Sequence, residues 1–368
     1  GAQIGLLDYA GTWDTNNCTV AANGSEKIQA STDDATFSRD REALQIIYVD
    51  ATQGWVITSV ADQGGTQASY ISASGGTETT SGNFKIHTFT GSGTFTVSSV
   101  GNAAGGGSLA SYLVVAGGAG GGSRNPGGTA GGGGAGGYRE GKASGDPYTA
   151  SPLNAPAGLT LSAQAYPVTV GAGGSPTTSP GNHFGASGSN SIFSTITSAG
   201  GGGGGASCSG NPPNLGRSGG SGGGGAFAPT PMIGGGTGNT PPVSPPQGNN
   251  GGAGEDGGTV SGGGGGGAGA VGATAIWPGT PGSGGNGVPS HITGSSVTRG
   301  GGGGGGSETL AAGAGGSGGG GQGRNHSSPQ SGPVAGTANT GGGGGGGYCS
   351  AGSTGGSGVV VIRYKYQN

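Results

Sequence analysis

The sequence predicts a mostly β and irregular protein with almost no α-helix: an N-terminal β module, then a β-sandwich-framed bundle of glycine helices of the polyproline II type. Glycine supplies 104 of the 368 residues, against a usual share of about 7%. Hydrophobic residues make up 29% and charged residues 7%, so an apolar core cannot hold the whole chain together. Short β-branched runs lie on both sides of the glycine-rich region, and no stretch shows a sustained helical period.

Glycine content and charge divide the chain near residue 104. Residues 1–104 hold 13 of the 104 glycines and a net charge of −6, and the remainder holds 91 glycines and a net charge of +3. This charge is too weak and dispersed to indicate a nucleic-acid partner. We expect an N-terminal β module at residues 1–62, a linker rich in Gly, Ser and Thr at 63–82, and a glycine-rich domain at 83–368.

In the β module, the runs at 43–49 and 55–58 are β-branched and aromatic, and a short turn at 50–54 separates them. Runs of this kind, bounded by Asp and Gly, are typical of strands and turns.

Residues 84–98 have the pattern of a hairpin. Residues 84–89 alternate apolar and polar side chains, a glycine-bearing loop follows, and residues 95–98 return. The alternation predicts that His87 faces solvent. The apolar face of the hairpin needs a cover; it comprises Phe84, Ile86, Phe89, Phe95 and Val97.

Further strands are expected at residues 112–115, 166–170, 192–197 and 359–364. The first and last of these bracket the glycine-rich segment. If they pair, the two ends of the segment come together, which makes it a closed insertion rather than a free tail.

Nine glycine runs lie inside this bracket. Glycine-rich sequence can remain a flexible coil, because glycine loses the most entropy on ordering. Alternatively, each run forms a polyproline II-type helix whose backbone groups bond to neighbouring runs. Similar run lengths and the concentration of proline in the spacers favour this ordered bundle. The runs cover residues 117–122, 131–137, 200–205, 222–225, 234–236, 262–267, 300–306, 313–321 and 341–347.

No arrangement of residues indicates catalysis, a metal or a cofactor. The three cysteines are far apart, without a C-x-x-C pair, and are read as isolated thiols or one incidental pair. The four histidines are dispersed, and the only adjacent carboxylate pairs are 33–34 and 255–256, unlike the converging carboxylates of a glycosidase. No apolar run approaches the ~18 residues of a membrane span.

Aromatic rings in the spacers are the better functional signal. Flat rings on loops, beside small hydrogen-bonding residues, suit the recognition of sugars or protein loops. The alternative is that each ring packs on the glycine bundle and seals it. We expect the contacts in the spacers at 207–217, 226–247, 273–281 and 322–339. The candidate receptor-binding residues are Trp277, Phe227, Tyr148, Phe184, Asn214 and Pro245.

Several segments resemble the glycine-rich domain of bacteriophage tail-fibre proteins, in versions common in phages of marine bacteria. They are residues 85–90 (KIHTFT), 93–97 (GTFTV), 112–118 (YLVVAGG), 136–139 (GGYR), 168–174 (VTVGAGG), 191–193 (SIF) and 355–364 (GGSGVVVIRY). The resemblance covers roughly residues 83–366, and residues 27–58 also look like β modules of phage fibres.

The resemblance implies stacked polyglycine II helices whose loops meet a host surface, a homotrimer, and other virion tail proteins as partners. We therefore expect an extracellular virion fibre protein, a distal tail-fibre adhesin that binds a host receptor, either a glycan or loops of an outer-membrane protein. A purely structural virion appendage, a capsid decoration, and a cellular extracellular filament or surface protein remain alternatives. An ice-binding protein is disfavoured, because the irregular spacers offer no flat, regular Thr face.

Overall fold

The structure, a computed structural model, describes residues 2–62, 68–176, 183–206, 215–227, 233–255, 260–308, 311–326 and 332–367. The chain forms two compact units. The first comprises Gly1–Ser69 with Asn102–Gly105, and the second comprises Tyr70–Gly101 with Gly106–Asn368.

The first unit is a small β module. Its three-stranded sheet has the order β1-β4-β5, and β2 pairs with β3. Leu44 and Ile46 of the central strand are buried, together with Ile28. The runs expected at 43–49 and 55–58 are therefore strands. The bounds are β1 Gln3–Leu7, β2 Cys18–Val20, β3 Ala35–Phe37, β4 Glu42–Asp50 and β5 Gly54–Asp62; a short 3-10 helix spans Ala103–Gly105.

The second unit contains two packed sheets. The larger one has the strand order β13-β12-β10-β21-β8-β7 with β14 attached to β10, and the smaller one has the order β17-β16-β15-β9-β6. The larger sheet contains β7 Thr77–Ser81, β8 Phe84–Phe89, β10 Leu109–Val115, β12 Tyr138–Gly141, β13 Asn154–Ala155, β14 Leu159–Thr160 and β21 Val359–Lys365. The smaller sheet contains β6 Ser72–Ser74, β9 Gly93–Ser99, β15 Ala165–Thr169, β16 Ser191–Phe193 and β17 Ile196–Ser198.

The prediction that residues 84–98 form a hairpin is wrong. Strand β8 pairs with β7 and β21, whereas β9 pairs with β6 and β15 in the other sheet. The loop between them crosses from one sheet to the other. Strands β6 and β7 lie in the range that was expected to be linker, where they extend both sheets.

The larger sheet is buried on both faces. One face packs against the smaller sheet through Tyr112, Val114, Val360 and Ile362, with Phe95 and Phe193 opposite. On the other face, Leu113, Val115 and Val361 pack against the segments around Tyr148 and Ile292. Because successive strand residues point to opposite faces, burial of both faces explains the uninterrupted apolar run at residues 359–362.

Strands β10 and β21 are antiparallel neighbours, with Val115 opposite Val359 and Tyr112 opposite Ile362. This pairing brings together the two ends of the glycine-rich segment, so the expectation of a closed insertion is confirmed. The strand expected at 192–197 is instead two strands, β16 and β17, separated by a turn at Ser194, whose φ is 52°.

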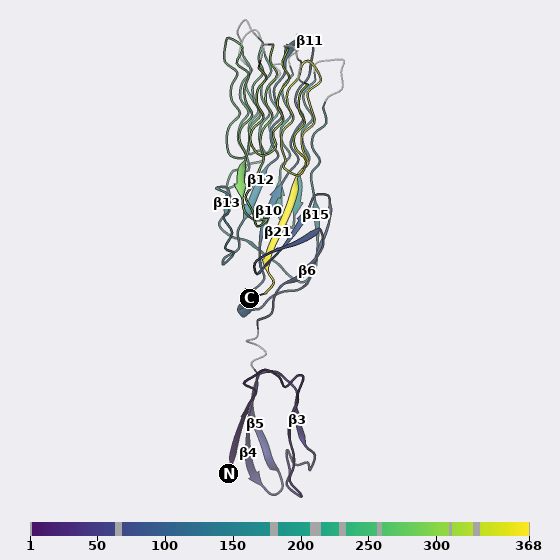
Figure 1. The fold of residues 1–368 in the computed structure, drawn as a ribbon, viewed down its shortest axis with the longest axis vertical. Helices are drawn as coiled ribbons and strands as arrows, with labels where there is room; N and C mark the ends of the chain where they lie inside the picture. Colours follow the sequence, from purple (N-terminus) through teal and green to yellow (C-terminus); the bar gives the residue numbers. More distant parts are fainter. Residues whose placement is uncertain are drawn as a thin grey trace. The chain divides into compact units, whose positions relative to one another are not determined.

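The glycine runs form extended segments that lie side by side (Figure 1) and bond laterally through their backbones. Along residues 130–137, every third N–H donates to the same neighbouring segment, as in Gly131 to the Gly205 carbonyl (3.0 Å) and Gly134 to the Gly202 carbonyl (2.9 Å). A repeat of three residues per turn is that of the polyproline II helix. The runs are therefore polyglycine II helices, and their backbone groups are paired rather than solvated. The run expected at 313–321 is instead two segments, because the chain turns at Gly318 and Gly319, whose φ values are 93° and 99°.

These segments form a hexagonal lattice, which we call the glycine lattice. Residues 130–137 lie at its centre and bond to six inner neighbours: 116–122, 199–205, 221–225, 262–267, 300–306 and 341–347. An outer layer surrounds them, made of segments 171–175, 185–190, 215–218, 233–238, 248–254, 270–277, 282–287, 313–318, 319–324, 333–338 and 352–358. Inner segments are nearly pure glycine because they have a neighbour on every side, whereas outer segments carry side chains that point outward.

Two further strand pairs lie at the edges of the lattice. Strand β18 Val288–Ser290 pairs with β19 Val297–Arg299, and β11 Arg124–Thr129 pairs with β20 Tyr348–Ser350. Among the described residues, no helix has the length and apolar character needed to cross a membrane.

Candidate binding surface at the distal end of the glycine lattice

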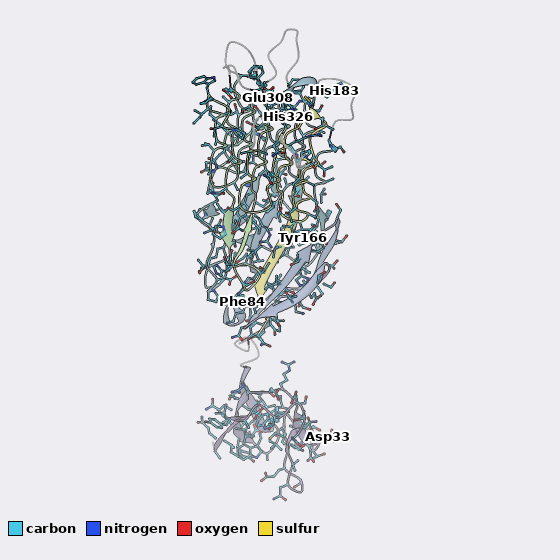
Figure 2. All side chains as sticks on the ribbon, turned by 45° about the horizontal axis from the view of Figure 1, so that its top comes forward. Asp33, Phe84, Tyr166, His183, Glu308 and His326 are labelled. Carbon is cyan, nitrogen blue, oxygen red and sulfur yellow. The ribbon has the colours of Figure 1, made fainter. Side chains whose placement is uncertain are left out.

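The lattice has a sheet end and a distal end. Strand β10 ends at Val115 and continues directly into segment 116–122, so residue 122 lies at the end away from the sheets. Gly122 bonds to Gly131, and Gly131 bonds to Gly205, which places these three residues and the connection at 123–129 at the distal end. In Figure 2, His183, Glu308 and His326 lie at this end.

Trp277 is an exposed apolar side chain of the distal end. It lies in a tight turn in which Ile276 and Thr280 exchange backbone hydrogen bonds of 2.8 and 2.9 Å. The buried carboxylate of Glu255 accepts a further, longer bond of 3.5 Å from the N–H of Gly279. Ile276 is 64% exposed and Trp277 63% exposed. The backbone of the turn is thus fixed while both apolar side chains project into solvent.

Phe184 and Phe227 also lie at the distal end, and both are half-buried. The guanidinium of Arg217 lies over the Phe184 ring, 4.9 Å from its centroid. A cation over a ring face is a stabilising contact. Phe184 is therefore already engaged within the chain, and the ring offers less of its surface than Trp277 does.

His326 and Tyr348 form another aromatic contact there, edge to face with 5.0 Å between ring centroids. Burial raises the pKa of Tyr348 to about 12, helped by Cys349 and Glu308. The phenol therefore stays protonated at neutral pH. Among the described residues, no group of three or more His, Cys, Asp or Glu could hold a metal ion.

Two of the expected contact residues lie away from this surface. Tyr148 is only 6% exposed and belongs to the core on the outer face of the larger sheet. The cations of Lys142 and Arg363 lie 5.4 and 5.5 Å from its ring centroid. The ring of this candidate is therefore packed within the chain, because the loop that carries it folds back onto the sheet.

Pro245 is half-buried in the loop that joins segments 233–238 and 248–254. Gln247 of this loop accepts a bond from the N–H of Tyr138, where β12 begins, so the loop lies at the sheet end. Pro245 and Trp277 are therefore at opposite ends of the lattice. Asn214 and much of the spacer at 207–217 lie outside the described residues.

Ile276 was not among the candidate residues predicted from the sequence. Its position next to Trp277 in a turn rich in Gly and Pro could have indicated its exposure, because a short turn has little chain nearby to bury an Ile side chain. The stretch of chain that contains the turn is itself uncharged, since no Lys, Arg, Asp or Glu occurs between residues 257 and 298.

The fold and this surface define a class of protein: a polyglycine II lattice framed by a β-sandwich that holds loops at one end. The chain belongs to the glycine-rich domain family, whose model matches residues 107–365. The matched range includes the lattice and the strands β10 to β21 that frame it. No curated protein sequence matches the chain.

Proposed function

We propose that the chain is a phage virion fibre protein, a distal tail-fibre adhesin that binds a host-cell receptor through the distal end of the glycine lattice. The resemblance of residues 83–366 to phage fibre domains supports the phage origin. The observation that carries the binding role is the exposure of Ile276 and Trp277, at 64% and 63%, on a turn fixed by its own backbone bonds.

A rigid scaffold favours binding, because loops that are ordered before binding lose less entropy when they meet a partner. An exposed indole ring can stack on a sugar ring or pack against an apolar protein loop. The stretch of chain that carries Trp277 has no Lys, Arg, Asp or Glu from residue 257 to residue 298, which suits an uncharged ligand surface, either a neutral glycan or loops of an outer-membrane protein. Several copies on one particle would raise avidity above the affinity of one site.

The test is competition. The purified chain, added before the phage that carries it, should reduce adsorption of that phage to its host. Trp277→Ala should weaken the competition by about 30-fold or more, the loss expected for an aromatic residue worth at least about 2 kcal/mol in an interface. Adsorption of labelled phage measures the effect.

Val49→Ala is the matched control, because Val49 is also an exposed apolar residue, at 55%, on strand β4 of the first unit and outside every expected contact spacer. It should compete as well as the wild type. A folded wild-type chain that does not compete at all would point to the structural virion role instead. Equal competition by Trp277→Ala would remove that ring from the contact surface.

A further inference from the structure

A cavity of about 250 Å³ lies over the outer face of the larger sheet, at the end of β21 away from the lattice. Val361 packs on that outer face, and Arg363, two residues further along the strand, points to the same side. Four separate segments meet at the cavity: Ser81 ends β7, Thr149 lies in the loop between β12 and β13, His291 follows β18, and Arg363 belongs to β21. We call it the Arg363 cavity.

The guanidinium of Arg363 is buried and held in one position. Arg363 is 2% exposed, and its Nε donates to both carboxylate oxygens of Asp146, at 2.9 and 3.1 Å. Nη1 donates to the carbonyl of Ile292 at 3.4 Å. The guanidinium carbon also lies 4.6 Å from the ring centroid of Phe84 and 5.5 Å from that of Tyr148, which are cation–π contacts. A group fixed in this way loses little entropy when it binds a ligand.

One nitrogen of this guanidinium has no partner within the part of the chain that the structure describes. Nε and Nη1 make the bonds given above, whereas Nη2 makes none. An Arg side chain carries five N–H donors and often binds a carboxylate through two of them at once. Because Asp146 occupies the Nε edge, the edge formed by Nη1 and Nη2 is the one that can bind a second carboxylate, supplied by a ligand in the cavity.

The other polar groups of the cavity also have hydrogen-bonding capacity that the fold does not use. The side chains of Ser81, Thr149 and His291 make no hydrogen bond among the described residues, although all three line the cavity. Two hydroxyls and an imidazole can donate to and accept from the hydroxyls of a sugar. A volume of about 250 Å³ is below the roughly 300–1,000 Å³ of pockets for drug-sized ligands, so the cavity suits a single sugar ring.

The charges around the cavity favour a ligand with one negative charge. Asp146 offsets the charge of Arg363, and Lys142 adds a second cation: its Nζ lies 5.4 Å from the ring centroid of Tyr148, which also lines the cavity. The carboxylate of Glu140 does not line the cavity, and it accepts hydroxyl bonds of 2.9 and 2.6 Å from elsewhere. One ligand carboxylate would therefore meet an excess of positive charge.

We propose that the Arg363 cavity binds a sugar acid, whose carboxylate accepts from the Nη1 and Nη2 edge of Arg363 while its ring hydroxyls bond to Ser81, Thr149 and His291. A neutral sugar would leave the guanidinium edge without a carboxylate. A small acid such as acetate would leave the hydroxyls and the imidazole unused. The site lies on the sandwich and not at the distal surface, so it does not rest on the proposed receptor role.

The test is calorimetric titration of the full chain with probes that separate these contributions. Glucuronate carries both the ring hydroxyls and the carboxylate, glucose lacks the carboxylate, and acetate lacks the ring. Glucuronate should bind about tenfold or more tightly than either, because a hydrogen bond to a charged group contributes about that much. Methyl glucuronide then distinguishes the source of the ligand: binding equal to that of glucuronate indicates a residue at the end of a glycan chain, and loss of binding indicates a free sugar acid.

Ser81→Asp tests the location of the site without disturbing the buried pair of Arg363 and Asp146. Ser81 is half-buried beside the cavity, and a carboxylate there should repel or replace that of the ligand, which weakens glucuronate binding about tenfold or more. Ser74→Asp makes the same change at an exposed serine of β6 and should leave the affinity unchanged. Thermal unfolding shows whether both variants fold.

If Ser81→Asp does not fold, Thr149→Ala, at an exposed position of the cavity, should show a smaller loss of affinity in its place. The proposal is overturned by a folded wild type that does not bind glucuronate, by glucose or acetate binding as tightly as glucuronate, or by equal affinities of the Ser81→Asp and Ser74→Asp chains.

Discussion

His87 is fully buried on β8, although its place in an alternating run predicted a solvent-facing position. The prediction was wrong because both faces of the larger sheet are covered. Nδ1 lies 2.6 Å from the carbonyl oxygen of Gly75 and therefore donates to it, and Nε2 then accepts from the Tyr364 hydroxyl at 2.9 Å. The ring also stacks on Tyr364, with centroids 5.5 Å apart. This pattern of bonds belongs to the neutral imidazole.

A pH dependence of stability follows for His87. Burial lowers its pKa, although the bond to Gly75 and the charge of Glu78 act in the opposite direction. The unfolded chain, with a His pKa of about 6.5, binds a proton that the folded state excludes. Stability is therefore complete above about pH 6.5 and falls as the pH drops below that value.

The melting temperature of the second unit should fall between pH 7 and pH 5. His87→Gln, which has no titrating group, should be less stable but should lose most of this slope. A slope that is unchanged in His87→Gln would assign the dependence to another group.

At the level of single side chains, the sequence could indicate which aromatic rings were candidate receptor contacts, but not which of them are exposed and which are buried. Trp277 is exposed and Tyr148 is buried, yet both stand beside proline and glycine in the sequence. The difference comes from the loop of Tyr148, which returns to cover β10 and β21, whereas the turn of Trp277 has only the lattice edge beneath it. Such long-range packing leaves no local pattern in the chain.

Among the elements, the glycine segments show how close backbone approach selects glycine. Gly133 lies in the central segment, donates to the carbonyl of Gly344 and accepts from Gly303, both at 2.9 Å. A Cβ at Gly133 would collide with the carbonyl oxygen of Ala119. Only backbone surrounds the site, so no flexible side chain could move aside.

Gly133→Ala should therefore destabilise the second unit by more than about 3 kcal/mol, beyond the usual cost of an added methyl group in a packed core. Thermal unfolding measures the loss. Gly234→Ala is the matched control, because Gly234 lies in an outer segment where a Cβ would meet only the Leu215 side chain at 3.6 Å. It should be neutral, or stabilising by about 0.4–1 kcal/mol. Equal losses in both variants would contradict the lattice packing.

The elements that the sequence predicted best are those with a strong local signal. The strands at 112–115 and 359–364 and the glycine helices were predicted from β-branched runs and from glycine runs. The division of those helices into inner and outer positions was not predicted. The sequence does mark it, because inner segments consist almost wholly of glycine and outer segments do not: residues 300–306 are all glycine, whereas 282–287 carry Ser and Asn. The hairpin at 84–98 failed because local alternation does not determine which sheet a strand joins.

For the second unit as a whole, the lattice and the sandwich are continuous. Segment 116–122 extends β10, segment 130–137 leads into β12, and segment 352–358 leads into β21. Ordering a residue costs roughly 1–2 kcal/mol, and a net hydrogen bond returns about 0.5–1.5 kcal/mol. The backbone hydrogen bonds of the lattice therefore do not exceed the conformational entropy cost of ordering its residues by a wide margin. The stability of the lattice should then depend on the apolar core of the sandwich.

A change in that core should thus be felt throughout the lattice. Phe193 is fully buried, with ring centroids 6.0 Å from Phe95 and 5.9 Å from Tyr166. Phe193→Ala should cost about 3–5 kcal/mol. If the lattice opens only when the sandwich unfolds, hydrogen exchange at lattice amides such as that of Gly303 should accelerate about 100- to 4,000-fold, since each 1.4 kcal/mol is a factor of ten.

Val334→Ala, on the exposed side of an outer segment, should leave exchange at Gly303 unchanged and so serves as the control. Lattice amides that keep their wild-type protection in Phe193→Ala would mean that the backbone bonds hold the lattice without the sandwich. Rapid hydrogen exchange at these amides in the wild type would instead show that the backbone hydrogen bonds of the lattice do not form. The expected result, acceleration in step with the loss of core stability, would show that a few buried aromatic and β-branched residues stabilise a structure made mainly of glycine.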